Sequence, residues 1–209
     1  MGNSNRDCPF SEWTEIQSRI YKGEILVNKN ILIISSTMSG TRRTKKLCEQ
    51  FEKGAKESLN NVELLELKGK KINYCLGCNT CQNNGGTCVY KDDVPEILEK
   101  MIKSDIIILA SPIYFYSIAG QMKTLIDRSC AKFNLLSNKE FYFILSCAAP
   151  YEEPYKADLD IAINSFRGFI KCLPNAKEKN IIIGDNMASV EIEKTKAYQD
   201  AYNLGKSIG

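Results

Sequence analysis

Residues 31–47, ILIISSTMSGTRRTKKL, decide the fold class of this chain. The stretch opens with a continuous apolar run, residues 31–34, which is typical of a short strand covered on both faces. A loop rich in serine and threonine follows, and then apolar residues at Leu47, Phe51 and Ala55 recur with helical spacing. A buried strand that leads through a short loop into a helix is the repeating unit of parallel sheets with helical crossovers.

The same alternation of strand and helix runs through the rest of the chain. Further apolar runs predict strands at residues 62–67, 106–110, 141–145 and 181–183. Helical patterns begin after Asp92 or Asp93 and recur at about 117–131, 161–170 and 190–208. We therefore predict one doubly wound α/β domain over residues 30–209, with a five-stranded parallel sheet and helices on both faces.

Residues 1–29 stand before this pattern. Ser11 is followed there by Trp13, Ile16 and Ile20 at helical spacing. An N-terminal helical extension is therefore expected over residues 1–29.

The composition bounds the class of protein. The chain has 209 residues, 44% hydrophobic and 25% charged, which suits one globular domain with a buried core. A net charge of +3, with both signs interspersed, gives no basis for binding nucleic acid. No apolar run approaches the ~20 residues needed to span a bilayer. The polar first residues lack the apolar segment of a signal peptide, so we expect a cytoplasmic protein with no membrane partner.

Cysteine and histidine usage narrows the chemistry. The nine cysteines are clustered, which favours a reducing compartment and metal or redox use over a disulfide framework. Histidine is absent, which excludes a Ser-His-Asp triad, a histidine base and a histidine-bound metal.

Four of the cysteines, Cys75, Cys78, Cys81 and Cys88, have the spacing C-x2-C-x2-C-x6-C. This spacing lets one short loop direct its sulfurs at a single centre, and thiolates are soft ligands that suit zinc or an iron–sulfur cluster. Successive x2 spacings are more typical of cluster ligation than of zinc sites. Four reduced thiols without a metal, in a loop that covers a neighbouring site, are the remaining alternative.

The loop after the first predicted strand has the properties of a phosphate site. Hydroxyls at Ser36, Ser39, Thr41 and Thr44, with the N-terminus of the following helix, can donate to phosphate oxygens. Arg42 and Arg43 lie where the helix dipole disfavours cations. A bound anion would offset that repulsion, and solvated arginines at the edge of the loop are the alternative. The loop lacks G-x-G-x-x-G and G-x-x-x-x-G-K-[ST], which argues against the usual dinucleotide and P-loop sites.

Two further loops lie at the same expected edge of the sheet. Pro112–Ser117 contains three aromatic residues that can flank a flat ring, with loop amides near the edge of that ring. The alternative for this segment is a hydrophobic strand end that a second subunit covers. The loop Cys147-Ala148-Ala149 is small and permits close approach of the backbone. A phosphate loop after the first strand and an aromatic loop after the third suit a mononucleotide with a planar ring, such as FMN.

From Ile31 to about Gly205 the chain resembles a known family, the flavodoxin-like NAD(P)H-dependent FMN reductases. The resemblance is carried by residues 75–78, 86–88, 91–93, 104–115, 120–123 and 127–128. The four-cysteine spacing is similar to that of the iron–sulfur flavoproteins within this family, whose compact motif holds a [4Fe-4S] cluster beside FMN. Thr37-Met38 departs from the family, which usually has Pro-Arg there, and Ala148-Ala149 replaces common glycines.

The resemblance implies a flavodoxin-like sheet with strand order 2-1-3-4-5, FMN as cofactor, NAD(P)H as co-substrate, and a homodimer or tetramer. It implies that FMN carries the chemistry, with no catalytic side chain required. The implied FMN contacts are Ser36, Ser39, Thr41, Arg43, Thr44, Pro112, Ile113, Tyr114, Phe115, Tyr116, Ser117 and Ala148. The implied cluster ligands are Cys75, Cys78, Cys81 and Cys88.

The function expected from these features is an FMN-dependent oxidoreductase that takes electrons from NAD(P)H or a reduced protein donor. One alternative is an electron carrier with no substrate of its own, reduced by a ferredoxin-like partner. Another alternative is a binding module that is stabilised by a structural zinc ion. A phosphate-accepting receiver domain is disfavoured, since Ser35-Ser36 and Ser111-Pro112 stand where that domain needs acidic residues.

Overall fold

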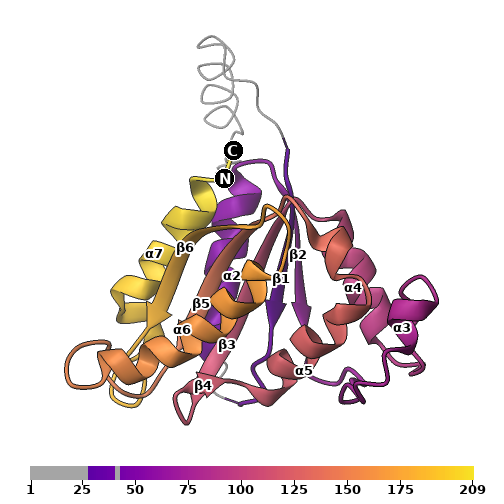
Figure 1. The fold of residues 1–209 in the computed structure, drawn as a ribbon. Coiled ribbons are helices and arrows are strands. Elements are labelled where there is room, and N and C mark those ends of the chain that lie inside the picture. The colour runs from indigo at the N-terminus through magenta and orange to yellow at the C-terminus, as the bar shows by residue number, and fades with distance from the viewer. Residues whose placement is uncertain (1–27, 41–42) are drawn as a thin grey trace, which may run out of the picture.

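The computed structural model describes residues 28–40 and 43–209. Five strands form a parallel sheet: β1 (Asn30–Ser35), β2 (Asn61–Glu66), β3 (Ile106–Tyr114), β5 (Glu140–Ser146) and β6 (Lys177–Gly184) (Figure 1). Their order across the sheet is β2-β1-β3-β5-β6, with every neighbouring pair parallel. Counted along these five strands, the order is 2-1-3-4-5, so the predicted flavodoxin-like fold is confirmed.

The sheet is covered on both faces because its strands are apolar on both faces. In β1, Ile31 and Ile33 pack against α2 (Arg43–Glu57) and α7 (Lys196–Lys206). The alternate residues Leu32 and Ile34 belong to a second core with α4, α5 and α6. These three helices span Val94–Lys103, Gly120–Arg128 and Lys156–Lys171.

Two glycines let α2 and α7 approach closely. A Cβ on Gly205 would stand 2.1 Å from the carbonyl oxygen of Phe51 in α2. A Cβ on Gly54 would stand 2.1 Å from the carbonyl oxygen of Tyr202 in α7. No side chain fits at that distance, so glycine at both positions sets the spacing of the two helices on this face.

The helix predicted from residue 117 begins later than expected. Ser117–Ile118 forms a short strand, β4, antiparallel to the end of β3, and α5 starts at Gly120. Ser111 explains the shift, because its Oγ accepts from the backbone N–H of Ala119 at 2.8 Å and holds the returning chain beside β3. At its other end α5 passes into a 3-10 helix, η1 (Ser129–Ala131), which is followed by η2 (Phe133–Leu136).

The last helix is also shorter than its sequence pattern. Residues 192–194 form the 3-10 helix η3 (Ile192–Lys194), and α7 begins only at Lys196. Thr195 caps α7, since its Oγ1 accepts from the Tyr198 N–H at 3.3 Å.

The predicted N-terminal extension lies outside the described residues except for residues 28 and 29, so it stays a prediction. Within the described part of the chain, none of the helices has the length and apolar character that crossing a bilayer requires.

Candidate active site at the carboxyl edge of the sheet

The carboxyl ends of β1, β3 and β5 meet at one edge of the sheet, the lower edge in Figure 1. Ser35 pairs with Ala110 across β1 and β3, and Pro112 pairs with Ser146 across β3 and β5. The connections from β1 and β3 leave toward opposite sides of the sheet, so this edge holds its topological switch point. Ligands of open α/β sheets bind at such a point.

The loop after β1 is held to the neighbouring strands by its own hydroxyls. Ser36 is buried, and both its N–H and its Oγ–H donate to the Ala110 carbonyl, at 2.9 and 3.1 Å. Thr44 is buried in the first turn of α2, and its Oγ1 lies 2.6 Å from Ser146 Oγ at the end of β5. The Thr44–Ser146 contact uses one of the two hydroxyl protons, so the other hydroxyl and the first N–H groups of α2 can still donate to an anion.

Not every residue of the predicted phosphate loop can be placed. Thr41 lies outside the described residues, and Arg43 is half-buried at the start of α2. Ser39 is half-buried in the loop itself. The loop and helix start therefore lie at the predicted edge, while the individual phosphate contacts stay predictions.

The aromatic segment after β3 forms a tight hairpin with β4. Tyr114 pairs with Ser117, so Phe115 and Tyr116 are the two turn residues, with φ angles of 48° and 58°. Left-handed angles at both turn positions are usual for Asn-Gly and strained for bulky side chains. The Phe115 side chain is fully exposed, and Tyr114 and Tyr116 are exposed as well. Strain that presents aromatic rings to solvent points to a binding role for this hairpin.

The loop after β5 is small and firmly held. Cys147 is buried, and its carbonyl accepts from Met187 N–H at 3.0 Å. Burial, with the Asp185 carboxylate nearby, raises the pKa of Cys147 to about 11, so this thiol is neutral at pH 7. Asp185 also accepts from the Tyr151 N–H at 2.8 Å. Ala148 is exposed at the edge, where its lack of a large side chain leaves the backbone accessible.

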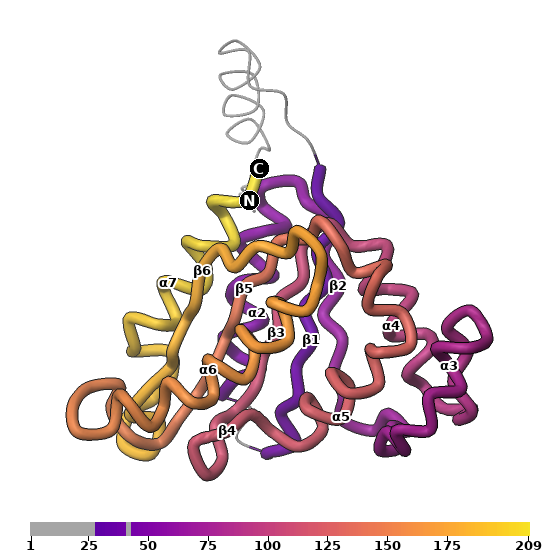
Figure 2. The backbone as a smooth tube through the Cα atoms, viewed as in Figure 1, coloured from indigo at the N-terminus to yellow at the C-terminus, as the bar shows by residue number. Residues whose placement is uncertain are grey.

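The four predicted cysteine ligands lie together in the segment between β2 and α4. This segment, which contains the short helix α3 (Thr80–Asn83), stands out at one side of the molecule beside α4 and α5 (Figure 2). Its cysteines line one pocket of about 50 Å³ with Arg128 and Cys130. Cys75 and Cys78 are exposed, and Cys81 and Cys88 are half-buried.

Cys130 is a fifth thiol in this pocket that the sequence motif does not contain. Its carbonyl accepts from Gln82 Nε2 at 2.7 Å, which ties α3 to η1. Burial, together with the neighbouring Cys81 and Cys75 thiols, raises the pKa of Cys130 to about 12. No local sequence spacing predicts that Cys130 lies in this pocket. It does so because the fold brings the end of α5 beside the cysteine segment.

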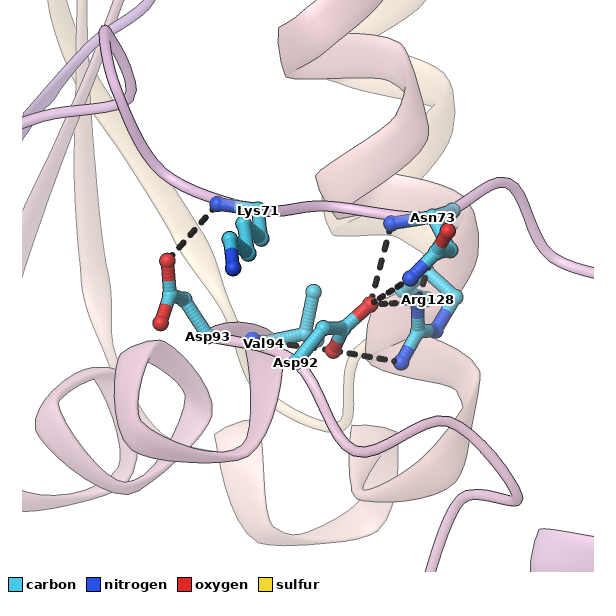
Figure 3. A network of polar contacts seen from close by, with 6 residues as sticks. All are labelled: Lys71, Asn73, Asp92, Asp93, Val94 and Arg128. Carbon is cyan, nitrogen blue, oxygen red and sulfur yellow. Dashed lines mark hydrogen bonds and ion pairs between the residues drawn. The ribbon is translucent and has the colours of Figure 1, made fainter.

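Arg128, which lines the pocket, forms a buried ion pair with Asp92 (Figure 3). The Arg128 and Asp92 side chains are 1% and 2% exposed. Arg128 Nη1 and Nη2 donate to the two Asp92 oxygens at 2.7 and 3.0 Å, and Nη1 also donates to the Asn73 carbonyl at 2.8 Å. Asp92 accepts further from Asn73 N–H at 2.9 Å and from Val94 N–H at 3.2 Å. The pair thereby ties the cysteine segment to the start of α4 and the end of α5.

Asp92, and not Asp93, accepts from the first N–H of α4. Asp93 instead accepts from the Lys71 N–H at 2.7 Å (Figure 3). Both acidic residues therefore fix the two ends of the cysteine segment to α4. The sequence reasoning assigned them only as helix caps and missed their role beside the pocket.

The pocket has the donor chemistry of a soft-metal site. Its thiols are soft ligands, and a buried guanidinium that can donate to sulfur lies beside them. Among residues 28–40 and 43–209, however, no three Cys, Asp or Glu side chains are gathered closely enough to bind one metal ion. The residue types fit an iron–sulfur group or zinc. The missing close group concerns a single metal ion, whereas each iron of a [4Fe-4S] cluster takes one cysteine, so the four sulfurs of a cluster site lie farther apart.

Comparison with known proteins agrees with this geometry. Residues 29–152 match the model of the NADPH-dependent FMN reductase family, and this range includes the loops after β1, β3 and β5 and the cysteine segment. The chain belongs to this family. The resemblance predicted from the sequence is thereby confirmed.

Curated relatives of this family member are iron–sulfur flavoproteins. One from Archaeoglobus fulgidus is 49% identical over 67 residues, which cover 32% of this chain and 30% of that protein. One from Methanocaldococcus jannaschii is 44% identical over 81 residues, covering 35% of this chain and 42% of that protein. One from Methanosarcina thermophila is 33% identical over 108 residues, covering 50% and 54%. The chain spans between about a third and a half of the length of these relatives.

Solved structures of the same fold are more distant in sequence. An azoreductase from Bacillus anthracis is 16% identical, with a TM-score of 0.66 over 85% of this chain and 99% of that chain. An NAD(P)H:quinone oxidoreductase from Methanothermobacter marburgensis is 13% identical, with a TM-score of 0.68 over 88% and 100%. An FMN-dependent NADH-azoreductase from Bacillus anthracis, solved in complex with FMN, is 15% identical, with a TM-score of 0.63 over 86% and 96%. These likenesses support the flavodoxin-like fold of this chain.

Proposed function

We propose that this family member is an FMN-dependent oxidoreductase that takes electrons from NADH or NADPH and passes them to an acceptor. The observation that carries the proposal is the meeting of three loops at one sheet edge, in a chain of the NADPH-dependent FMN reductase family. The start of α2 can bind a phosphate, and the aromatic hairpin can contact a flat ring. Both lie at the topological switch point of the sheet, where such a ligand binds.

The side chains have separate tasks at this edge. The start of α2, with Ser39, Thr41, Arg43 and Thr44, holds the phosphate of FMN, and Ser36, whose N–H and hydroxyl both donate to the Ala110 carbonyl, fixes the loop around it. The hairpin Pro112–Ser117 and the backbone at Ala148 orient the ring and exclude water from one side. Bound FMN supplies the two-electron and one-electron chemistry, and the protein supplies position and electrostatics. A histidine base is not required, which agrees with the absence of histidine.

The cysteine pocket extends this proposal. Cys75, Cys78, Cys81 and Cys88 hold a [4Fe-4S] cluster, which relays electrons between FMN and a ferredoxin-like protein. The support is the ligand spacing, the buried guanidinium beside the thiols, and the name of the curated relatives. The four irons of such a cluster take one thiolate each, so the four sulfurs need not meet at a single metal ion.

The proposed protein works in the cytoplasm as a homodimer or tetramer. Free cysteines suit a reducing compartment, and the eight within the described residues are all free. The exposed aromatic side chains of the hairpin give a second copy an apolar surface to cover.

Anaerobic purification with an absorbance spectrum, and with iron and sulfide assays, tests the proposal. Flavin bands with about four iron and four sulfide per chain support both cofactors. Flavin without iron overturns the cluster, and zinc in place of iron does the same. A chain that binds no added FMN overturns the whole proposal.

The electron donor is tested separately under anaerobic conditions. Bleaching of the flavin absorbance by NADH or NADPH within seconds is the expected result. Bleaching only by a reduced ferredoxin would instead identify an electron carrier with no nicotinamide substrate.

A further inference from the structure

One buried donor in the wall of the cysteine pocket has no acceptor. Arg128 uses Nη1 and Nη2 on Asp92 and Asn73, and its Nε–H has no hydrogen-bond partner within the described part of the chain. Leaving a buried donor unpaired costs about 1–3 kcal/mol, more for a charged group, so such donors nearly always have a partner. A charged example beside a pocket therefore needs an explanation.

The surroundings of Arg128 indicate what its acceptor is. Across residues 28–40 and 43–209, Ser35 Oγ is the only other buried side-chain nitrogen or oxygen without a partner, and it lies against the Cys48 thiol. Arg128 lines the cysteine pocket, and its guanidinium lies beside the Cys88 thiol. No sulfur of the described residues makes a hydrogen bond to Nε in this structure, but thiols line this side of the pocket, and the Cys88 sulfur beside the guanidinium can accept one.

The remaining contacts of Arg128 fix the direction of its Nε–H. The forked contact with Asp92 holds the outer end of the guanidinium. The Tyr90 ring covers it, with Arg128 Cζ 5.0 Å from the ring centroid. A planar group held at its outer edge and on its face has no freedom to turn Nε toward another partner.

We propose that Arg128 is a positioning residue of the cysteine site, whose Nε–H donates to the Cys88 sulfur when the pocket holds its iron–sulfur group. The proposal rests on the proposed function for the existence of that group. Asp92 acts through Arg128, because it holds the guanidinium in the donating orientation.

The contact has a measurable consequence for electron transfer. A hydrogen bond to a ligand sulfur stabilises the reduced form, which carries the extra negative charge, more than the oxidised form. Removing the donor therefore shifts the midpoint potential of the group to more negative values. Lysine keeps the positive charge and loses the planar fork, so Arg128→Lys separates the hydrogen bond from the charge.

The test uses the anaerobically loaded protein and three chains: wild type, Arg128→Lys and Asp92→Asn. Potentiometric titration followed by EPR gives the midpoint potential of the iron–sulfur group. We expect Arg128→Lys to lower this midpoint potential by at least about 59 mV, which corresponds to a tenfold change in the equilibrium constant of a one-electron reduction. Asp92→Asn weakens the same ion pair but keeps the donor, and is expected to shift the potential less.

A second readout observes the contact directly. Wild-type protein containing ¹⁵N-arginine is expected to show one weakly coupled nitrogen in pulsed EPR of the reduced group, absent from Arg128→Lys. Wild type with iron but without that coupling, or a potential equal in wild type and Arg128→Lys, overturns the role of Arg128 alone. A wild-type protein that binds no iron overturns the cluster proposal, and the role of Arg128 fails with it.

Discussion

Thr44 Oγ1 lies 2.6 Å from Ser146 Oγ, and both residues are buried. The contact joins the first turn of α2 to the carboxyl end of β5, so the proposed phosphate site depends on a hydrogen bond across the sheet. Thr44→Val keeps the shape of the side chain and leaves the Ser146 hydroxyl unpaired. We expect it to lower the free energy of unfolding by about 1–3 kcal/mol and to weaken FMN binding.

Thr44→Ser is the matched control for this prediction, because it keeps the hydroxyl. Urea unfolding gives the stability, and quenching of FMN fluorescence gives the dissociation constant. Equal FMN affinity in Thr44→Val and the wild type would show that the phosphate site does not depend on this contact.

Because of the Arg128–Asp92 pair, the free energy of unfolding is expected to depend on pH in the acidic range. Burial opposes ionisation of Asp92, but hydrogen bonds from Arg128 and Asn73 outweigh it and hold the Asp92 pKa well below its usual range. Because the folded pKa lies below the unfolded value of about 3.9, the stabilisation is present above about pH 4 and lost as the pH falls below it. Unfolding free energies measured between pH 7 and pH 3 should therefore decrease toward low pH, and less steeply in Asp92→Asn.

Glu178→Gln is the control for that pH series. Glu178 pairs with Arg167 near the surface, and its pKa is also lowered, first by the hydrogen bond from Arg167. A half-exposed pair contributes about 0–1 kcal/mol, so the slope should change little. A slope changed as much by Glu178→Gln as by Asp92→Asn would contradict the assignment to the buried pair.

Gly205 predicts a large cost for one added methyl group. A Cβ there would stand 2.1 Å from the Phe51 carbonyl oxygen and 2.9 Å from the Ala55 nitrogen, which are backbone atoms that cannot turn aside. Gly205→Ala should destabilise the protein by about 1–3 kcal/mol or more, through separation of α2 and α7. Gly168→Ala in α6 has open space around its Cβ and should stabilise by about 0.5–1 kcal/mol. Thermal unfolding of both variants measures the contrast.

The sheet was predictable from sequence because its strands are continuous apolar runs whose two faces both need cover. Residues 31–34 and 106–110 carry that signal directly. The start of α5 was not predictable, since Ser117 and Ile118 suit a helix locally and are held in β4 by a contact from Ser111. Tertiary contacts override local propensity at such ends.

The candidate site divides in the same way. The four motif cysteines share a local spacing, and their common pocket follows from one loop. Cys130 and Arg128 reach that pocket only because the fold brings the end of α5 beside it, which no spacing in the sequence encodes. The hydroxyls of Ser36 and Thr44 were expected to face a ligand, and their protein partners could not be foreseen without the strand register.

The strained hairpin predicts that replacing Phe115 by glycine raises the stability of the protein and weakens ligand binding. Phe115 has a φ of 48° and is fully exposed, so Phe115→Gly removes strain and almost no packing. We expect it to stabilise the protein by about 1 kcal/mol and to weaken FMN binding. Leu59→Gly relieves a similar angle, φ 63°, away from the site and should leave FMN affinity unchanged. If Phe115→Gly binds FMN as tightly as Leu59→Gly, the ring does not lie against this side chain.

The five thiols of the cysteine pocket predict unequal roles in holding iron. Cys75→Ser, Cys78→Ser, Cys81→Ser and Cys88→Ser should each lose most of the iron after anaerobic reconstitution, because each removes one of four proposed thiolate ligands. Cys130→Ser should keep it, since the motif supplies four ligands without Cys130. Cys172→Ser, at the exposed end of α6, is the control and should match the wild type. Iron per chain and the absorbance spectrum are measured for all six variants after desalting. Loss of iron in Cys130→Ser would show that Cys130 is a ligand, and one of the four motif cysteines would then not be.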